Sequence, residues 1–193
     1  MTINNLLDSL TTSGWYVWDD FLSTTEIQSI KDCIPDTLQE AKIGNGGSLQ
    51  LNTNVRGDVT LWLDDDMGDP IKNYFDKMDD VRQELNAGLY LGLRDFETHF
   101  CRYKPGAFYQ KHLDNPQAKS RRKVTTVLYM NEDWQAGDGG ELVVYDRDDA
   151  ELLTLEPKAG RMIFFMSEQF PHEVLPTNTV RESIAGWFLN SAA

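Results

Sequence analysis

The chain has 193 residues, 40% of them hydrophobic, and a formal net charge of −13 at pH 7. This length suits one folded domain with a real core, and the acidic balance argues against a nucleic-acid partner, which needs clustered Lys and Arg. No window reaches the roughly 20 apolar residues of a membrane span, and the first residues lack the features of a signal peptide. Two cysteines make neither a disulfide framework nor a cysteine-based zinc site. The composition therefore predicts a soluble cytoplasmic protein.

The first ninety residues are predicted to mix helices and strands. A short helix is expected over 4–10, and the aromatic run 14–22 indicates a strand. The next helix opens with a capping box, in which Ser23 caps the first turn and Glu26 reaches back to it.

A loop, a strand and the clearest helix of the sequence follow. Glycine-rich 44–47 indicates a loop, and alternation over 55–63 indicates a strand. The residues expected on one face of that strand are Val59, Leu61 and Leu63. For the helix, Asp69 is the expected cap, Pro70 fits the first turn, and Gly88 is the expected end. Its apolar stripe, which predicts core packing, consists of Ile71, Tyr74, Phe75, Met78, Val81 and Leu85.

From residue 96 the chain becomes a series of short apolar segments separated by turn signals. The segments are 96–103, 107–114, 124–131, 140–146, 151–157, 161–168, 172–176 and 181–190. Eight closely spaced β-like segments predict a sandwich or barrel, with a jelly roll as the natural candidate. We expect a single domain of the α+β class, mainly β. Residues 1–90 would form a support region whose helices pack on one sheet, and residues 91–190 the jelly-roll core.

His112 and Asp114 are candidates for two metal ligands. In a strand, residues i and i+2 project to the same side, and the expected strand stops at the Asn-Pro that follows Asp114. Because aspartate is abundant in this chain, a lone His-x-Asp decides little. His172 supplies a third candidate at the start of a later segment. Two imidazoles and one carboxylate form the facial triad of non-heme Fe(II) oxygenases, although zinc accepts the same ligands.

Arg181 lies nine residues after His172 in an otherwise apolar strand. One interpretation is an exposed arginine paired with a surface acid. The other is a fixed guanidinium, always charged, that binds a dicarboxylate cosubstrate through two N–H groups. The sequence favours neither interpretation over the other. The residues that alternation places on one face of this strand are Arg181, Ser183, Ala185 and Trp187.

Together these motifs resemble the 2-oxoglutarate and Fe(II)-dependent dioxygenases. They are most similar to the prolyl 4-hydroxylases of the hypoxia-sensing type and their bacterial relatives. The similar segments are "CRYKPGAFYQKHLDNP", "RRKVTTVLYMNEDW", "GDGGELVVYD", "LEPKAGRMIFFMSEQFPHEVLPT" and "RESIAGWF". The resemblance covers most of residues 50–190. It implies a double-stranded β-helix fold and an enzyme that hydroxylates a proline of a protein substrate with O2, releasing succinate and CO2.

The resemblance also implies a role for each candidate site residue. His112, Asp114 and His172 would bind Fe(II), and Arg181 with Tyr129 would bind the far carboxylate of 2-oxoglutarate. The other residues implied for the cosubstrate pocket are Tyr103, Leu142 and Trp187. Those implied near the substrate peptide are Arg56, Asp58, Tyr109 and Arg122. L-ascorbate is implied as an accessory cofactor, and bacterial members imply elongation factor Tu as the protein partner.

Several alternatives stay open at this stage. Tyr103 and Tyr129 also fit strand aromatics with satisfied hydroxyl groups, and Arg56 with Asp58 also fits a surface ion pair of little energetic worth. The basic run 119–123 fits a solvated loop or a rim for an acidic peptide. The alternative functions are a 2-oxoglutarate oxygenase that acts on another protein residue or a small molecule, and a non-enzymatic, cupin-like sensor of metal or cosubstrate.

Two residues depart from the family's pattern. Ala185 stands where the animal oxygen sensors carry a threonine, which puts in doubt any water held there by a hydroxyl. His99 stands where those enzymes have an apolar residue, and alternation places it on the face of Cys101 and Tyr103. An inward histidine is more often a satisfied core group than a ligand. Our hypothesis is that His99 lies beside the cosubstrate pocket.

Overall fold

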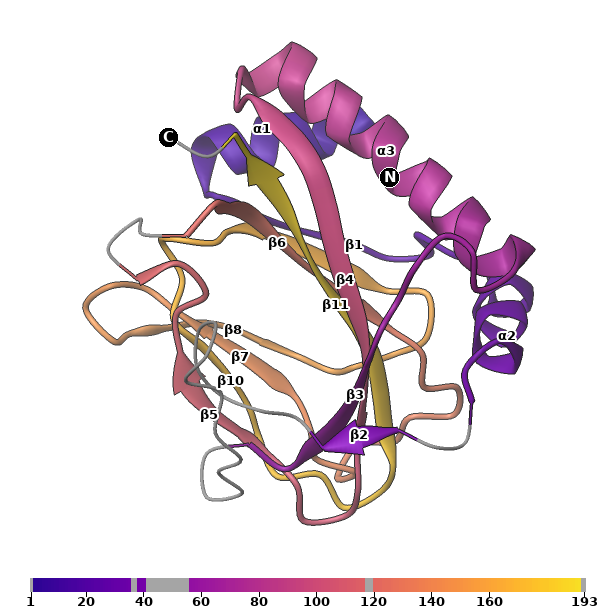
Figure 1. The fold of residues 1–193 in the computed structure, drawn as a ribbon. Helices are drawn as coiled ribbons and strands as arrows, with labels where there is room; N and C mark the ends of the chain where they lie inside the picture. Colours follow the sequence, from indigo (N-terminus) through magenta and orange to yellow (C-terminus); the bar gives the residue numbers. More distant parts are fainter. Residues whose placement is uncertain (1, 36–37, 41–55, 117–119, 192–193) are drawn as a thin grey trace.

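Two antiparallel sheets pack face to face in the computed structural model, which describes residues 2–35, 38–40, 56–116 and 120–191 (Figure 1). In sheet order, the larger sheet contains β1 (Trp15–Trp18), β9 (Met162–Met166), β6 (Arg122–Tyr129), β11 (Arg181–Asn190), β4 (Leu93–Tyr103), β3 (Asp58–Trp62) and β2 (Gln39–Glu40). The smaller sheet contains β5 (Tyr109–His112), β10 (His172–Val174), β7 (Leu142–Tyr145) and β8 (Glu151–Leu155). This is the double-stranded β-helix that the sequence predicts, and each of the eight predicted segments overlaps one strand, although β4 and β6 begin two or three residues earlier than predicted.

Three helices cover the outer face of the larger sheet: α1 (Ile3–Thr12), α2 (Thr24–Asp32) and α3 (Asp69–Leu89) (Figure 1). The predicted capping box of α2 is confirmed, because Ser23 Oγ accepts from the Glu26 amide at 3.3 Å and Glu26 Oε2 accepts from the Ser23 amide at 2.7 Å. Among the described residues no helix is long and apolar enough to cross a membrane.

The predicted boundaries of α3 are wrong at both ends. Gly68 occupies the N-cap position, so Asp69 is already helical, and the helix runs through Gly88 to Leu89. Gly88 serves the packing of α3 and not its termination, because a Cβ there would lie 2.8 Å from Leu7 Cδ1 of α1. Tyr90 instead adopts the left-handed conformation after the helix, with φ of 55°.

Alternation along the strands divides the interior into two clusters. The helices and the outer face of the larger sheet form one core, which includes the apolar stripe of α3. The second cluster lies between the sheets. On β4, for example, Phe100 belongs to the first cluster and Cys101 to the second, because successive side chains of a strand point to opposite faces.

The register of the larger sheet places the candidate residues in rows across its inner face. The rows are Arg181 beside Tyr103, Ser183 between Cys101 and Tyr129, Ala185 between His99 and Val127, and Trp187 between Glu97 and Thr125. These rows form one wall of the space between the sheets. The short strand β2 is not predicted by the sequence, and the loop predicted over 44–47 lies outside the described residues.

Candidate metal and cosubstrate site

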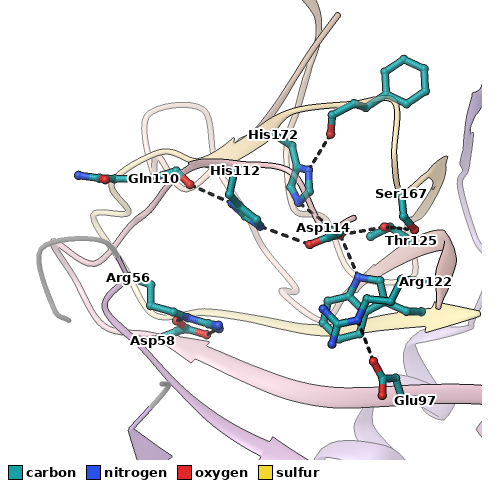
Figure 2. A network of polar contacts seen from close by, with 12 residues as sticks. Arg56, Asp58, Glu97, Gln110, His112, Asp114, Arg122, Thr125, Ser167 and His172 are labelled. Atoms are coloured by element: carbon teal, nitrogen blue, oxygen red, sulfur yellow. Dashed lines mark hydrogen bonds and ion pairs between the residues drawn. The ribbon is translucent and has the colours of Figure 1, made fainter. Parts of the chain in front are cut away.

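The three predicted metal ligands face one another between the sheets (Figure 2). Ligand atoms of His112, Asp114 and His172 all lie within 4.8 Å of one another. Asp114 Oδ1 lies 3.5 Å from His112 Nε2, and Asp114 Oδ2 lies 3.8 Å from His172 Nε2. The two histidines are direct cross-strand partners in β5 and β10. Pairing in the smaller sheet therefore brings together residues that are far apart in the sequence.

Asp114 reaches the site differently from the sequence prediction. The predicted strand over 107–114 is too long, because β5 ends at His112 and Asp114 lies in a bend. Asn115 holds that bend: its side chain is fully buried, accepts from the Ser120 amide at 2.7 Å and donates to the carbonyl oxygens of Ser120 and Arg122. The carboxylate is thus aimed by a side-chain hydrogen-bond network and not by strand alternation.

Both imidazoles are oriented by backbone carbonyls. His112 Nδ1 lies 2.9 Å from the carbonyl oxygen of Gln110, and His172 Nδ1 lies 3.1 Å from that of Phe170. A carbonyl only accepts, so each Nδ1 carries the proton and each Nε2 offers its lone pair to a metal. Burial, together with the neighbouring His112, lowers the pKa of His172 to about 4. This ring is therefore neutral at pH 7, as a metal ligand must be.

Asp114 is kept ionised by donors around its Oδ2 atom. Burial by itself raises its pKa, but the neighbouring His172 and His112 and a hydrogen bond from Trp187 outweigh that effect and hold the pKa well below its usual value. Trp187 Nε1 donates at 2.9 Å and Thr125 Oγ1 at 2.8 Å. Because the Thr125 hydroxyl has one hydrogen, it accepts from Ser167 Oγ, also at 2.8 Å. The result is a chain of donors that ends on the carboxylate.

Thr125 and Ser167 belong to the site but are not among the residues predicted from the sequence. A period of two from Tyr129 along β6 leads to Thr125, so the alternation contained a signal for it. Ser167 directly follows β9, and no local pattern marks it.

Arg181 is 1% exposed, so it is not a surface arginine. Its Nε donates to the Gly140 carbonyl at 2.8 Å and its Nη1 to Ser183 Oγ at 3.1 Å, but its Nη2 has no hydrogen-bond partner among the described residues. The buried hydroxyl of Tyr129 is also unpartnered there. Leaving such groups unpaired costs free energy. The two groups are therefore suited to the oxygen atoms of an anionic ligand.

Apolar and aromatic groups enclose this pair of donors. The Arg181 guanidinium carbon lies 5.0 Å from the ring centre of Tyr103 and 5.3 Å from that of Tyr129. Leu142 of β7, in the opposite sheet, is 1% exposed and belongs to the cluster that contains both tyrosines. Trp187, whose indole donates to Asp114, links this pocket to the metal ligands.

Of the four residues predicted to lie near a substrate, Figure 2 shows Arg56 and Asp58 on one side of the metal ligands and Arg122 on the other. Arg56 forms a bidentate pair with Asp58, with distances of 2.7 and 2.5 Å, and its guanidinium lies 4.5 Å from the ring centre of Tyr109. Tyr109 stacks on His112 with a centroid distance of 3.8 Å. The Arg56–Asp58 pair is mostly buried, with side chains 11% and 0% exposed.

The second group consists of Arg122 and two neighbours. The guanidinium of Arg122 lies 3.6 Å from the ring centre of Trp187, and its Nε donates to Glu97 at 2.8 Å. Trp187 is therefore held between Arg122 and Asp114.

The fold and the site define a non-heme metal centre with three protein ligands, in the class of the oxygenases that use two imidazoles and a carboxylate. The family model of the 2OG-Fe(II) oxygenase superfamily matches residues 98–189. The human prolyl hydroxylase EGLN3 is 32% identical over 196 residues, which cover 92% of this chain and 79% of that protein. The chain belongs to the prolyl hydroxylase family of this superfamily.

Two further relatives extend the likeness. The crystal structure of a Pseudomonas putida prolyl-4-hydroxylase is 36% identical, with a TM-score of 0.87, and the match covers 99% of this chain and 100% of that one. Human Egl nine homolog 1 is 28% identical over 202 residues, which cover 99% of this chain. The chain spans only 47% of that protein's length.

The residues present fit the metal and cosubstrate of the superfamily. Two imidazoles and one ionised carboxylate suit Fe(II) and leave three coordination positions free. The unpartnered donors of Arg181 and Tyr129 suit a carboxylate of 2-oxoglutarate.

Proposed function

We propose that this chain is a prolyl 4-hydroxylase that uses Fe(II), 2-oxoglutarate and O2 to modify a protein substrate. One observation carries the proposal. The triad of His112, Asp114 and His172 shares one interior space with Arg181 and Tyr129, whose buried donors have no partner among the described residues. A metal site alone would not need these donors, and a dicarboxylate pocket alone would not need the triad.

Each residue of the site has a part in this reaction. When bound, Fe(II) supplies the chemistry by which O2 and 2-oxoglutarate yield succinate, CO2 and one oxygen atom for the substrate. His112, Asp114 and His172 would hold the ion and leave coordination positions for the cosubstrate and O2. Arg181 and Tyr129 hold the far carboxylate and fix the direction of the molecule. Tyr103, Leu142 and Trp187 exclude water from the pocket.

A protein substrate is supported by the shape and chemistry of the surroundings of the metal. Tyr109 is half-buried beside His112, and the part of its ring that His112 and Arg56 leave uncovered suits contact with the compact apolar ring of proline. The Arg56–Asp58 pair on one side and Arg122 on the other provide polar groups for a peptide backbone. Relatives of this chain are named prolyl hydroxylases. Among protein substrates we propose elongation factor Tu, by resemblance to bacterial members of the family.

The test is turnover with elongation factor Tu, Fe(II), 2-oxoglutarate and L-ascorbate, with succinate measured and the substrate examined by mass spectrometry. We expect succinate release and one added oxygen atom on a prolyl residue. Asp114→Ala should abolish both while the protein stays folded, and turnover equal to that of the unchanged protein would refute the metal assignment.

The same assay separates the alternatives. Oxygen added to proline in other proteins of a cell extract, but not in elongation factor Tu, would keep the activity and change the substrate. Oxygen on a different residue type would favour another 2-oxoglutarate oxygenase activity. Binding of Fe(II) and 2-oxoglutarate without turnover on any of these proteins would favour a sensor.

A further inference from the structure

His99 occupies the inner face of β4, in the row that crosses the middle of the site. Its cross-strand partners are Ala185 of β11 and Trp62 of β3. The residue is 6% exposed, and the ring centres of Trp62 and Trp187 lie 5.0 and 5.4 Å from its own. The two residues that depart from the family's pattern, His99 and Ala185, are therefore direct neighbours on one wall.

The space between the sheets opens above Ala185. On the inner face of β11, Arg181, Ser183 and Trp187 are 1%, 2% and 7% exposed. Ala185 lies among them, with paired strands on both sides, and yet it is only half-buried. Solvent therefore reaches the centre of this wall through the site itself. His99 borders that opening on the side of β4.

The position of His99 also corresponds to one end of the cosubstrate. The Arg181 guanidinium donates to Ser183 and so lies over the Ser183 row. The row of Ala185 and His99 is two residues further along β11, at about 7 Å. The next row contains Trp187, which holds Asp114. A five-carbon dicarboxylate anchored at Arg181 thus reaches the row of His99 with its other carboxylate, beside the metal ligands.

The contacts of the His99 imidazole indicate which ring nitrogen carries the hydrogen. Burial raises the pKa of the Cys101 thiol, and burial, together with Arg56, lowers the pKa of His99 to about 4, so both groups are neutral at pH 7. Cys101 Sγ lies 3.0 Å from His99 Nδ1. An imidazole nitrogen is a better acceptor than a thiol sulfur, so the thiol donates to Nδ1 and Nε2 carries the N–H. No hydrogen bond joins Nε2 to a described side chain.

We propose that His99 binds the cosubstrate, with its Nε2–H donating a hydrogen bond to the metal-side carboxylate of 2-oxoglutarate. Cys101 is the positioning residue that fixes the tautomer and orientation of this ring. This inference rests on the proposed function. It adds a second contact to 2-oxoglutarate, at the carboxylate opposite the one that binds Arg181, which is the end of the cosubstrate beside the metal. The size of Ala185 makes room for the imidazole and the ligand in the same row.

The test is an anaerobic titration of 2-oxoglutarate into the Fe(II)-loaded protein, followed by the charge-transfer absorbance of the complex. His99→Met removes the donor and keeps the bulk, and it should raise the Kd for 2-oxoglutarate about tenfold, or about 1.4 kcal/mol. His99→Gln keeps an N–H group at similar reach and should recover most of the affinity. The affinity for Fe(II) alone should stay unchanged in both variants. Should His99→Met fail to fold, His99→Leu gives the same test.

Three results would overturn this role of His99. The Kd for 2-oxoglutarate could be unchanged in His99→Met, or it could rise equally in the Met and Gln variants, which would mark a packing effect. It could also stay unchanged while the KM for the protein substrate rises, which would place the contact on the substrate. Absence of the absorbance band from the unchanged protein would instead overturn the proposed function as a whole.

Discussion

Replacing Arg181 with methionine removes the buried charge of the proposed cosubstrate pocket and keeps a side chain of comparable length. In the protein, Arg181 is 1% exposed and its Nη2 has no hydrogen-bond partner among the described residues. The substitution therefore tests whether this charge contributes to binding of the cosubstrate or to stability of the fold.

The size of the effect follows from burial. Removing one partner of a buried, hydrogen-bonded charge pair costs about 2–5 kcal/mol, so the affinity for 2-oxoglutarate should fall about 30-fold or more. Without ligand, the variant should be about as stable as the unchanged protein, because a desolvated charge without an acidic partner is costly to keep. The stability gained by removing this charge is offset in part by the loss of the hydrogen bonds to Gly140 and Ser183.

Thermal unfolding with and without cosubstrate measures both quantities in one assay. At 100 times its Kd, 2-oxoglutarate should stabilise the metal-loaded protein by about 2.7 kcal/mol. For Arg181→Met at the same concentration the value should drop below about 1 kcal/mol. Arg94→Met is the matched control, because Arg94 is an exposed arginine of β4. Stabilisation by 2-oxoglutarate that is the same in Arg181→Met and in Arg94→Met would refute the assigned role.

Three further predictions concern the ligands and their support. Trp187→Phe removes the indole donor to Asp114 and should weaken Fe(II) binding about 10- to 100-fold; an unchanged Kd in an anaerobic Fe(II) titration would contradict this. Gly140→Ala should destabilise the protein by about 1–2 kcal/mol and also weaken 2-oxoglutarate binding, because Gly140 has φ of +66° and a Cβ there would lie 3.0 Å from Arg181 Cδ. Gly137→Ala has φ of +97° and open space around the new Cβ, so it should lose stability from backbone strain but keep its affinity for 2-oxoglutarate. Equal cosubstrate affinity in the two variants would count against an effect of the Gly140 Cβ on Arg181. Finally, the metal-free protein should lose stability in denaturant titrations as the pH falls from about 6.5 towards 4, by about 1.4 kcal/mol per pH unit for each buried histidine. The sign follows because His99 and His172, with pKa values of about 4, stay neutral in the folded state while the unfolded chain takes up protons; a flat profile over this range would show that these rings are not buried neutral.

Much of this architecture could be predicted because the signals for it are local. The apolar stripe of α3 depends on a period that is visible within one segment, and so do the strand positions. Ser23 and Glu26, only three residues apart, are sufficient to predict the start of α2. The end of α3 could not be predicted in this way. Gly88 looks like a helix terminator in the sequence, but its small size is required by the contact with Leu7 of α1.

The geometry around Asp114 could not be predicted for the same physical reason. Its position depends on Asn115, which binds the backbone at Ser120 and Arg122, and its charge depends on Thr125 and Trp187 from two other strands. These partners all lie outside residues 107–114, at separations from 5 residues for Asn115 and Ser120 to 73 for Asp114 and Trp187, so alternation within that segment cannot predict them. The residue types were predicted from spacing and resemblance, whereas the hydrogen bonds that orient them required the folded chain.

The most direct test of the central claim is the absorbance of the protein on anaerobic addition of Fe(II) and 2-oxoglutarate. If the triad binds the metal and Arg181 directs the cosubstrate onto it, a metal-to-ligand charge-transfer band appears only when both are present, and Asp114→Ala shows none. Absence of the band from the unchanged protein, or a band of equal strength in Asp114→Ala, would contradict the assignment of this site.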